Sequence, residues 1–277
     1  MNNKKIITNL VFSGGGVNGI AHIGALFALK ELECLDKVEV LVGTSVGSLV
    51  MSLYAIGYEP WELYDFIKLF DLSKLKNLSI QNISLLGLDT GTNIEFVIKK
   101  LIKGKGYQED IKLKELYEIK KKKIVFTAVC INTMELCHIS HETHPNLPLF
   151  LAIRMSTSLP FIYCPVTYEG NMYIDGGCLD NFPISMFKND KNNTIGLLLS
   201  GEKNVIKKID HLETYIIRVL QCIMEGMSMH SKKGFEECTI TVNIETLNLA
   251  NFDISNERKD ELFLKGYNAV MNNKDKL

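Results

Sequence analysis

Short apolar runs alternate with longer segments of helical periodicity along this 277-residue chain. The short runs, rich in β-branched residues, predict strands at residues 6–12, 38–42, 123–132, 135–140, 172–174 and 194–199. Apolar positions three and four apart predict helices at residues 20–33, 46–56, 60–70, 92–103, 208–229 and 256–271. This order predicts an α/β fold in which helices flank both faces of a mainly parallel central sheet.

The alternation is interrupted between residues 60 and 116. There the stretch 71–91 is rich in Ser, Asn and Leu and has weak periodicity. An insertion at this position is compatible with a lid or cap over an active site, and equally with a packing layer over the sheet edge. The chain length suits a single domain, 1–277, with 60–116 as the insertion and 200–277 as a helical C-terminal part.

The motif Gly43-Thr44-Ser45-Val46-Gly47 lies at the junction between a predicted strand and a predicted helix. A serine between two glycines at such a junction is typical of the nucleophile elbow, a sharp and strained turn. Gly43 and Gly47 would let the backbone pass closely while the Ser45 hydroxyl stays accessible. The motif therefore makes Ser45 a candidate nucleophile.

Two further glycine turns follow predicted strands. After the first strand, Gly14, Gly15 and Gly16 offer unshielded backbone N–H groups, which an oxyanion hole requires. After the strand at 172–174, Asp175 precedes two glycines. Parallel-sheet folds bring the carboxyl ends of distant strands together, so Asp175 can serve Ser45 as a general base without a histidine.

The first glycine cluster also fits a dinucleotide-binding motif, because Gly14, Gly16 and Gly19 have the G-x-G-x-x-G spacing between a strand and a helix. That function needs an acidic residue at the end of the next strand to bind the ribose. The strand at 38–42 ends in the Ser45 elbow instead. A dinucleotide-binding oxidoreductase is therefore the weaker alternative.

With these motifs in this order, the chain resembles the patatin-like phospholipases, which are lipid acyl hydrolases with a Ser–Asp dyad and a three-layer α/β/α fold. The resemblance extends over roughly residues 9–199 and includes the stretches 154–160 and 180–183 on either side of the Asp175 turn. One position departs from the family pattern. Many members have a basic residue where this chain has Asn18, so the resemblance implies a lipid ester more firmly than a phospholipid.

The resemblance implies that Asp175 deprotonates Ser45, which attacks a fatty-acyl ester of the phospholipase A or lysophospholipase type. It also implies that N–H groups of the Gly14, Gly15 and Gly16 loop bind the oxyanion, with no metal or organic cofactor. The competing class is a non-catalytic lipid-binding or assembly protein on the same fold. That class would be expected to lack Ser45 or Asp175, and both are present.

The amino-acid composition limits the kinds of partner and the location that the sequence predicts. The net charge of −1 and the pI of about 6.6 provide no electrostatic basis for nucleic-acid binding. Seven cysteines without a C-x-x-C pair favour reduced thiols and hence a cytoplasmic location. No segment has the roughly 20 apolar residues that span a bilayer, so membrane contact is expected to be peripheral. Nothing in the sequence defines an oligomeric state.

Several side chains have two interpretations. His22 suits a packed helix position better than a Ser–His–Asp triad, and the cluster His138, His141 and His144 fits surface residues better than a zinc site. Arg154 can either anchor loops or contact substrate. On the helix at 60–70, Trp61 and Tyr64 lie off the apolar face and could touch a membrane.

Overall fold

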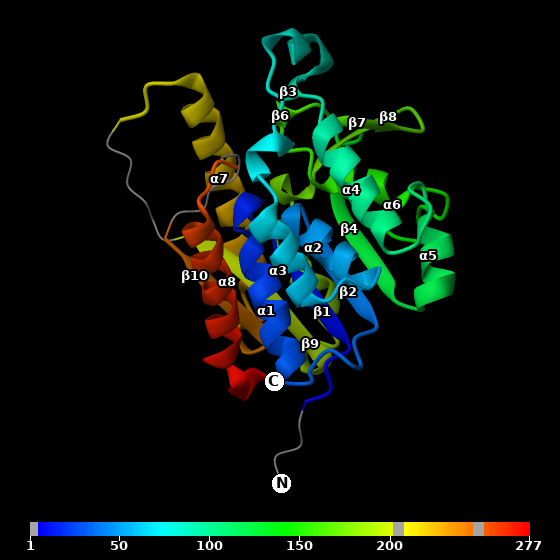
Figure 1. The fold of residues 1–277 in the computed structure, drawn as a ribbon, viewed down its shortest axis with the longest axis vertical. Coiled ribbons are helices and arrows are strands. Elements are labelled where there is room, and N and C mark those ends of the chain that lie inside the picture. Colours follow the sequence, from blue (N-terminus) through cyan, green and yellow to red (C-terminus); the bar gives the residue numbers. More distant parts are fainter. Residues whose placement is uncertain (1–4, 202–207, 246–251) are drawn as a thin grey trace.

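An eight-stranded sheet forms the centre of the protein in the computed structural model, which describes residues 5–201, 208–245 and 252–277 (Figure 1). The strand order is β10-β9-β1-β2-β4-β8-β7, and β5 also pairs with β4. The strands are β1 Asn9–Phe12, β2 Val40–Thr44, β4 Lys123–Cys130, β5 Glu135–Ile139, β7 Val166–Tyr168, β8 Asn171–Asp175, β9 Thr194–Gly201 and β10 Thr239–Ile244. A separate two-stranded sheet pairs β3 (Gly87–Asp89) with β6 (Phe161–Tyr163).

The centre of the large sheet is parallel and one side of it is antiparallel. β1 runs parallel to β2 and β9, β10 parallel to β9, and β4 parallel to β2. β5 and β8 run antiparallel to β4, and β7 antiparallel to β8. The predicted mainly parallel sheet is therefore confirmed.

Helices cover this sheet. They are α1 Ile20–Glu31, α2 Val46–Ala55, α3 Pro60–Leu69, α4 Thr92–Gly104, α5 Leu113–Lys120, α6 Leu149–Ser156, α7 Leu212–Lys232 and α8 Asn256–Met271. Figure 1 shows α1, α2, α3 and α8 in front of the strands. Alternate strand residues face opposite layers: Leu10 and Phe12 pack in the large cluster with the helices, whereas Val11 packs in a smaller cluster with Phe182 and Phe235.

Four strands are absent from the sequence-based prediction. β3, β6 and β7 have three residues each, too few to show a periodic pattern. Beyond residue 199 the sequence pattern predicts only helices, whereas β10 extends the sheet beside β9. The C-terminal part of the chain is thus bound to the central sheet through a strand as well as through helix packing.

Helix α8 packs directly on α1 at two glycines. A side chain at Gly24 of α1 would collide with the Phe263 carbonyl, and one at Gly266 of α8 would collide with the Ala21 carbonyl. Both helices also contribute to a shared cluster that contains Ala21 and Leu262. The close approach of the two backbones depends on both glycines.

We expect Gly266→Ala to destabilise the protein by about 2 kcal/mol or more, because the added methyl group meets backbone that cannot rotate away. Thermal unfolding measures this effect. Gly226→Ala on α7 is the matched control, since its methyl group would meet open space, and it should be neutral or stabilising by up to ~1 kcal/mol. Equal melting temperatures for the two variants would contradict the tight α1–α8 contact.

Candidate active site

Ser45 occupies the sharp turn between β2 and α2. Its backbone has φ 54° and ψ −126°, a conformation that non-glycine residues rarely adopt, and its exposed fraction is 8%. A side chain at Gly43 would lie 2.7 Å from the backbone of Gly47 and Ser48. One at Gly47 would lie 2.6 Å from the Ser13 carbonyl oxygen. The structure therefore requires glycine at both positions and stores strain at the serine between them.

A chain of hydroxyl groups holds the elbow in this conformation. The Ser45 N–H donates to Ser156 Oγ at 3.0 Å, Ser156 Oγ lies 2.5 Å from Ser48 Oγ, and Ser48 Oγ donates to the Gly43 carbonyl at 3.1 Å. All of these groups are buried. Ser156, at the end of α6, is a site residue that sequence reasoning did not single out, although it lies in the family-like stretch 154–160.

The glycine-rich loop after β1 lies beside the elbow. A side chain at Gly14 would be 3.2 Å from Ser45 Cβ. The Gly14 N–H itself donates to the Asn181 carbonyl at 3.0 Å, so the expectation that Gly14 contributes an oxyanion donor is wrong. The N–H groups of Gly15 and Gly16 have no partner within the described part of the chain. Gly16 has φ 58°, in the left-handed region that favours glycine.

Buried side chains fix the shape of this loop. The Asn18 side chain is 1% exposed and donates from Nδ2 to the Gly15 carbonyl at 2.9 Å. The ring of His22 is fully buried, packs edge-on against Phe12 and has Nε2 2.8 Å from the Ser13 carbonyl. Burial lowers the pKa of His22 to about 4, partly offset by the bond to Ser13, so the ring is neutral at pH 7. The prediction of a packed His22 is confirmed.

Asp175 ends β8 and is fully buried. Its Oδ1 accepts the Gly177 N–H at 2.8 Å, while Oδ2 has no hydrogen-bond partner of good geometry among the residues described. Burial raises the pKa of Asp175 to about 6, opposed by hydrogen bonding to the Ser45 hydroxyl and to the Gly177 N–H. The Ser45 hydroxyl is thus a side-chain proton donor that acts on the pKa of this carboxyl.

Asn181 connects the two glycine turns, a role that sequence reasoning missed. Its Oδ1 would collide with a side chain at Gly14 and would lie 2.8 Å from one at Gly177, and it has no hydrogen-bond partner in the described ranges. Its Nδ2 donates to Ser228 Oγ of α7 at 2.9 Å. Ser45, Asp175 and the loop of Gly15 and Gly16 therefore converge although 130 residues separate the first two.

The remaining histidines lie outside this arrangement. No described histidine is hydrogen-bonded to Ser45 or Asp175. The ring of His141 stacks on Tyr117 with centroids 3.7 Å apart, and His144 Nδ1 contacts Thr143. Within residues 5–201, 208–245 and 252–277, no group of three or more His, Cys, Asp and Glu side chains is placed to hold a metal ion. The structure therefore gives the histidine cluster at 138–144 no ligand role.

Arg154 anchors loops. It is 2% exposed, its Nη2 donates to the Thr90 carbonyl at 3.3 Å, and its guanidinium lies over the ring of Tyr163. A side chain at Gly91 would collide with the same guanidinium. Of the two interpretations of Arg154, the structure thus supports the loop anchor.

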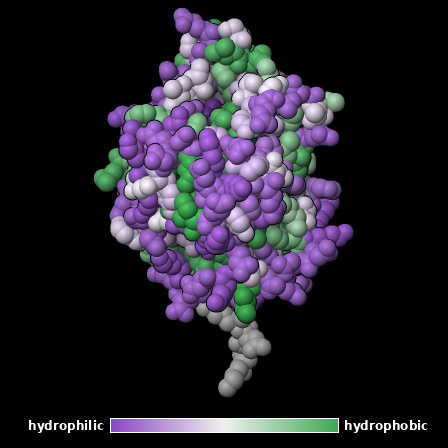
Figure 2. Space-filling model, turned by 90° about the vertical axis from the view of Figure 1, so that its right-hand side faces the viewer, coloured by the Kyte–Doolittle hydropathy of each residue, from purple (hydrophilic) through white to green (hydrophobic). Residues whose placement is uncertain are grey.

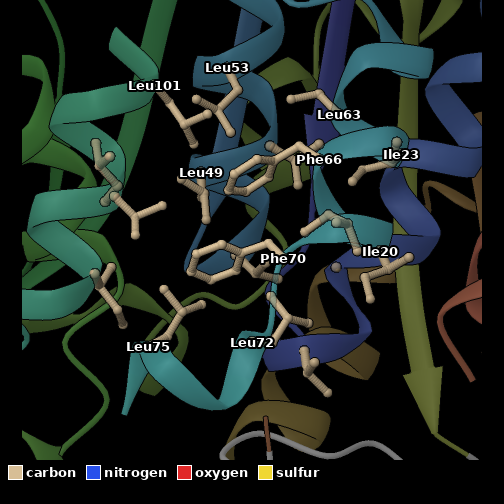
Figure 3. Close-up of a pocket in the computed structure, with 18 of the residues that line it drawn as sticks. Ile20, Ile23, Leu49, Leu53, Leu63, Phe66, Phe70, Leu72, Leu75 and Leu101 are labelled. Carbon is tan, nitrogen blue, oxygen red and sulfur yellow. The ribbon is translucent and has the colours of Figure 1, made fainter. Parts of the chain in front are cut away.

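An apolar pocket adjoins the glycine-rich loop and the elbow, because Gly16 and Val46 form part of its wall. Every residue that lines it is apolar or glycine. Figure 3 shows Leu49 and Leu53 of α2 and Leu63 and Phe66 of α3 directed into this space, together with Phe70, which follows α3. Residues of α4 complete it. The interrupted region 60–116 therefore supplies the pocket wall opposite α2.

The two aromatic residues of α3 that were expected to touch a membrane lie in different surroundings. The Tyr64 hydroxyl donates to the Asp260 carboxylate and its ring lies 4.1 Å from that of Phe263, so Tyr64 packs on α8. Trp61 is 55% exposed in the first turn of α3, at the opposite end of the helix from the residues that lead into the stretch 71–91. In the described part of the chain no helix is long and apolar enough to cross a membrane.

Comparison with known proteins shows the family of the chain. Residues 10–188 match the family described as patatin-like phospholipase. The probable lipid hydrolase 463L of Invertebrate iridescent virus 6 is 32% identical over 197 residues, which are 68% of this chain and 67% of that protein. Lysophospholipase NTE1 of Meyerozyma guilliermondii is 28% identical over 179 residues, 65% of this chain and 12% of that much longer protein. The crystal structure of VipD from Legionella pneumophila has a TM-score of 0.64 at 18% identity, covering 98% of this chain and 67% of that one.

The pKa of Asp175 predicts a pH dependence. Only the carboxylate can take a proton, so kcat/KM for ester hydrolysis should fall tenfold per pH unit below about pH 6. Asp175→Asn should reduce kcat by roughly 10³-fold or more at every pH. A pH–rate profile of both proteins measures this, and a variant within about tenfold of the wild type would contradict the role of Asp175.

The burial of Asp175 also predicts how stability depends on pH. Ionisation of Asp175, which activity requires, lowers the stability of the fold. Since the folded-state pKa lies above the usual value of 3.8, ionised Asp175 destabilises the fold above pH 4, and fully so above pH 6. Asp175→Asn should therefore be more stable than the wild type at pH 8, by up to roughly 2–3 kcal/mol, and lose this advantage at pH 4. Thermal melts at the two pH values test the difference, and a variant less stable than the wild type at pH 8 would refute it.

Proposed function

Since the chain belongs to the patatin-like phospholipase family, we propose that Ser45 is its nucleophile and Asp175 its general base. Its activity is that of a serine hydrolase that acts on lipid acyl esters, as in the related lipid hydrolase and lysophospholipases. The observation that carries the proposal is the pairing of a strained serine with a buried carboxyl whose pKa is raised to about 6. A base with that pKa is ionised at pH 7 and accepts a proton more readily than an ordinary aspartate.

The reaction follows from the positions of these groups. Asp175 takes the hydroxyl proton of Ser45 as Oγ attacks the acyl carbonyl, and the N–H groups of Gly15 and Gly16 stabilise the oxyanion. As the tetrahedral intermediate collapses, Asp175 returns the proton to the leaving alcohol. It then deprotonates a water molecule that attacks the acyl-enzyme, which releases the fatty acid and restores Ser45. No step uses a metal or an organic cofactor.

We assign the apolar pocket to the fatty-acyl chain. It begins beside Gly16 and Val46, next to the position of the reacting carbonyl, and its walls contain no polar side chain. In this assignment the insertion 60–116 is a cap over the acyl chain, and the single domain 1–277 is completed by the C-terminal part at 200–277, whose helix α8 packs on α1.

Phospholipids and lysophospholipids are the proposed substrates. The presence of Asn18 is compatible with a substrate that contains a phosphate group. The Asn18 amide is buried and donates to the Gly15 carbonyl, so it does not line a surface that the substrate would contact. The seven cysteines are all free thiols, which supports work in a reducing, cytosol-like compartment with peripheral access to membranes. A non-catalytic lipid-binding protein on the same fold is the alternative, and Ser45 variants separate the two.

We expect Ser45→Ala to abolish ester hydrolysis and labelling by a fluorophosphonate probe. Ser45→Gly should be equally inactive but more stable than Ser45→Ala, by roughly 1 kcal/mol, since glycine tolerates φ 54°. Gel electrophoresis measures labelling by the probe, and mass spectrometry measures the release of fatty acid from mixed lipids. Thermal melts measure the stability difference between the two variants. A labelled Ser45→Ala variant would place the nucleophile elsewhere, and an inactive wild type on every ester would favour the lipid-binding alternative.

The acyl assignment predicts a dependence on chain length. Leu49→Trp should fill the pocket and reduce kcat/KM for a 16-carbon ester by about tenfold or more, while a four-carbon ester that stays near Ser45 is hydrolysed normally. Leu49→Ala is the control and should retain activity on the long ester. A uniform loss on both esters would assign the pocket to packing instead.

A further inference from the structure

The stretch 77–88 projects from the molecule and carries exposed aliphatic side chains. It contains no charged residue. Its exposed aliphatic residues, here called the apolar tip, are Leu78, Ile80, Ile83, Leu85 and Leu86. Ile80 is 79% exposed, and the short helix at the centre of the stretch buries none of its residues. Figure 2 shows hydrophobic residues gathered at this upper end of the molecule.

Several backbone groups of the stretch 77–88 are hydrogen-bonded within it or to its base. The Ser79 N–H donates to the Leu88 carbonyl at 2.7 Å, and Asn82 Nδ2 donates to the same carbonyl at 3.1 Å. At the base, the Asn77 N–H donates to the buried Asp89 carboxylate at 2.6 Å. These bonds lower the cost of moving the stretch out of water, because fewer backbone groups lose a partner.

A second exposed apolar surface lies at the same end. Leu212, Tyr215, Val219 and Ile223 follow one another at helical spacing on α7 and are all exposed. The inner side of α7 reaches the active site, where Met224 lies against Gly177 and Ser228 binds Asn181. Figure 1 shows α7 and the β3 region as two projections at the upper end of the molecule.

The active site lies between these two surfaces. The tip continues the chain from Leu72 and Leu75, which line the acyl pocket, and α7 packs beside the turn that carries Asp175. A lipid that entered the pocket with its acyl chain would therefore approach between the tip and α7.

We propose that the apolar tip inserts into the surface of a lipid bilayer, with the exposed row of α7 as a second contact, and so places the active site over its substrate. This proposal rests on the proposed function for the source of the lipid. The exposed apolar residues of the tip are all Leu and Ile, whereas the hot spots of protein interfaces are enriched in Trp, Tyr and Arg. This composition favours a lipid surface over a protein partner. The stretch also has no charged side chain, so its entry into the bilayer removes no charge from water.

The test measures vesicle binding without catalysis. In a Ser45→Ala background, Ile80→Asn combined with Ile83→Asn should reduce cosedimentation with phosphatidylcholine vesicles by about tenfold or more. Ile119→Asn combined with Leu264→Asn is the matched control, because these two aliphatic residues are also exposed but lie on α5 and α8. The control should bind vesicles like the parent protein.

A second arm uses active enzyme. The tip variant with Ser45 intact should hydrolyse a soluble short-chain ester at the normal rate and vesicle phospholipid at a rate about tenfold lower. A Leu85→Trp probe in a Trp61→Phe background should shift its emission to the blue on adding vesicles, and brominated acyl chains should quench it.

Three results would overturn the proposal: equal vesicle binding by the tip variant and the control, no response of the Leu85→Trp probe, or a lipid-free dimer that the tip substitutions dissociate. The last would identify a second copy of the chain as the occupant. Failure of Ser45 as nucleophile would leave the vesicle-binding result unaffected, so the two proposals can fail separately.

Discussion

The close contact between the turn after β1 and the turn after β2 determines the geometry of the candidate active site. The elbow after β2 and the glycine-rich loop after β1 touch where Gly47 lies against the Phe12 and Ser13 carbonyls, with no room for a side chain. Because β1 and β2 are parallel neighbours in register, both turns leave the sheet at the same edge. The candidate nucleophile Ser45 and the free N–H groups of Gly15 and Gly16 are therefore placed by backbone packing, and only the candidate base must come from another part of the sheet.

Asp175 is positioned by an antiparallel strand rather than by the parallel centre of the sheet. Its burial lowers the stability of the folded chain. It ends β8, which runs antiparallel to β4, opposite Ala128. Complete burial and one good backbone donor leave the carboxyl poorly solvated, which raises its pKa and its basicity together. The property that makes it a useful base thus destabilises the folded chain at neutral pH. Neighbouring hydrogen bonds, such as those of Ser156 and Asn181, hold the surrounding loops in this unfavourable arrangement.

Sequence patterns predict the parts of this protein that are locally encoded. The parallel strands other than β10, the elbow glycines and Asp175 at a strand end each have a signature within a few residues, so most of the central sheet and the candidate dyad could be inferred before the structure. The roles of Ser156, Asn181 and the Gly14 N–H could not, because each depends on a partner more than 100 residues away. The pairing of β3 with β6 and the packing of Tyr64 on α8 also join segments that lie far apart in the sequence, so no local pattern predicts them.

The shape of the acyl pocket limits how a lipid can enter. Its walls offer no polar partner, so a headgroup that entered it would lose its hydrogen bonds to water without replacement. In the proposed assignment the ester therefore stops beside Gly16 and Val46, with its headgroup directed away from α2 and α3. The tip at 77–88 and the row on α7 are two exposed apolar surfaces at that end. An enzyme built this way extracts an acyl chain most easily when its site lies against the surface from which the chain comes, because the chain then passes from one apolar medium to another without crossing water.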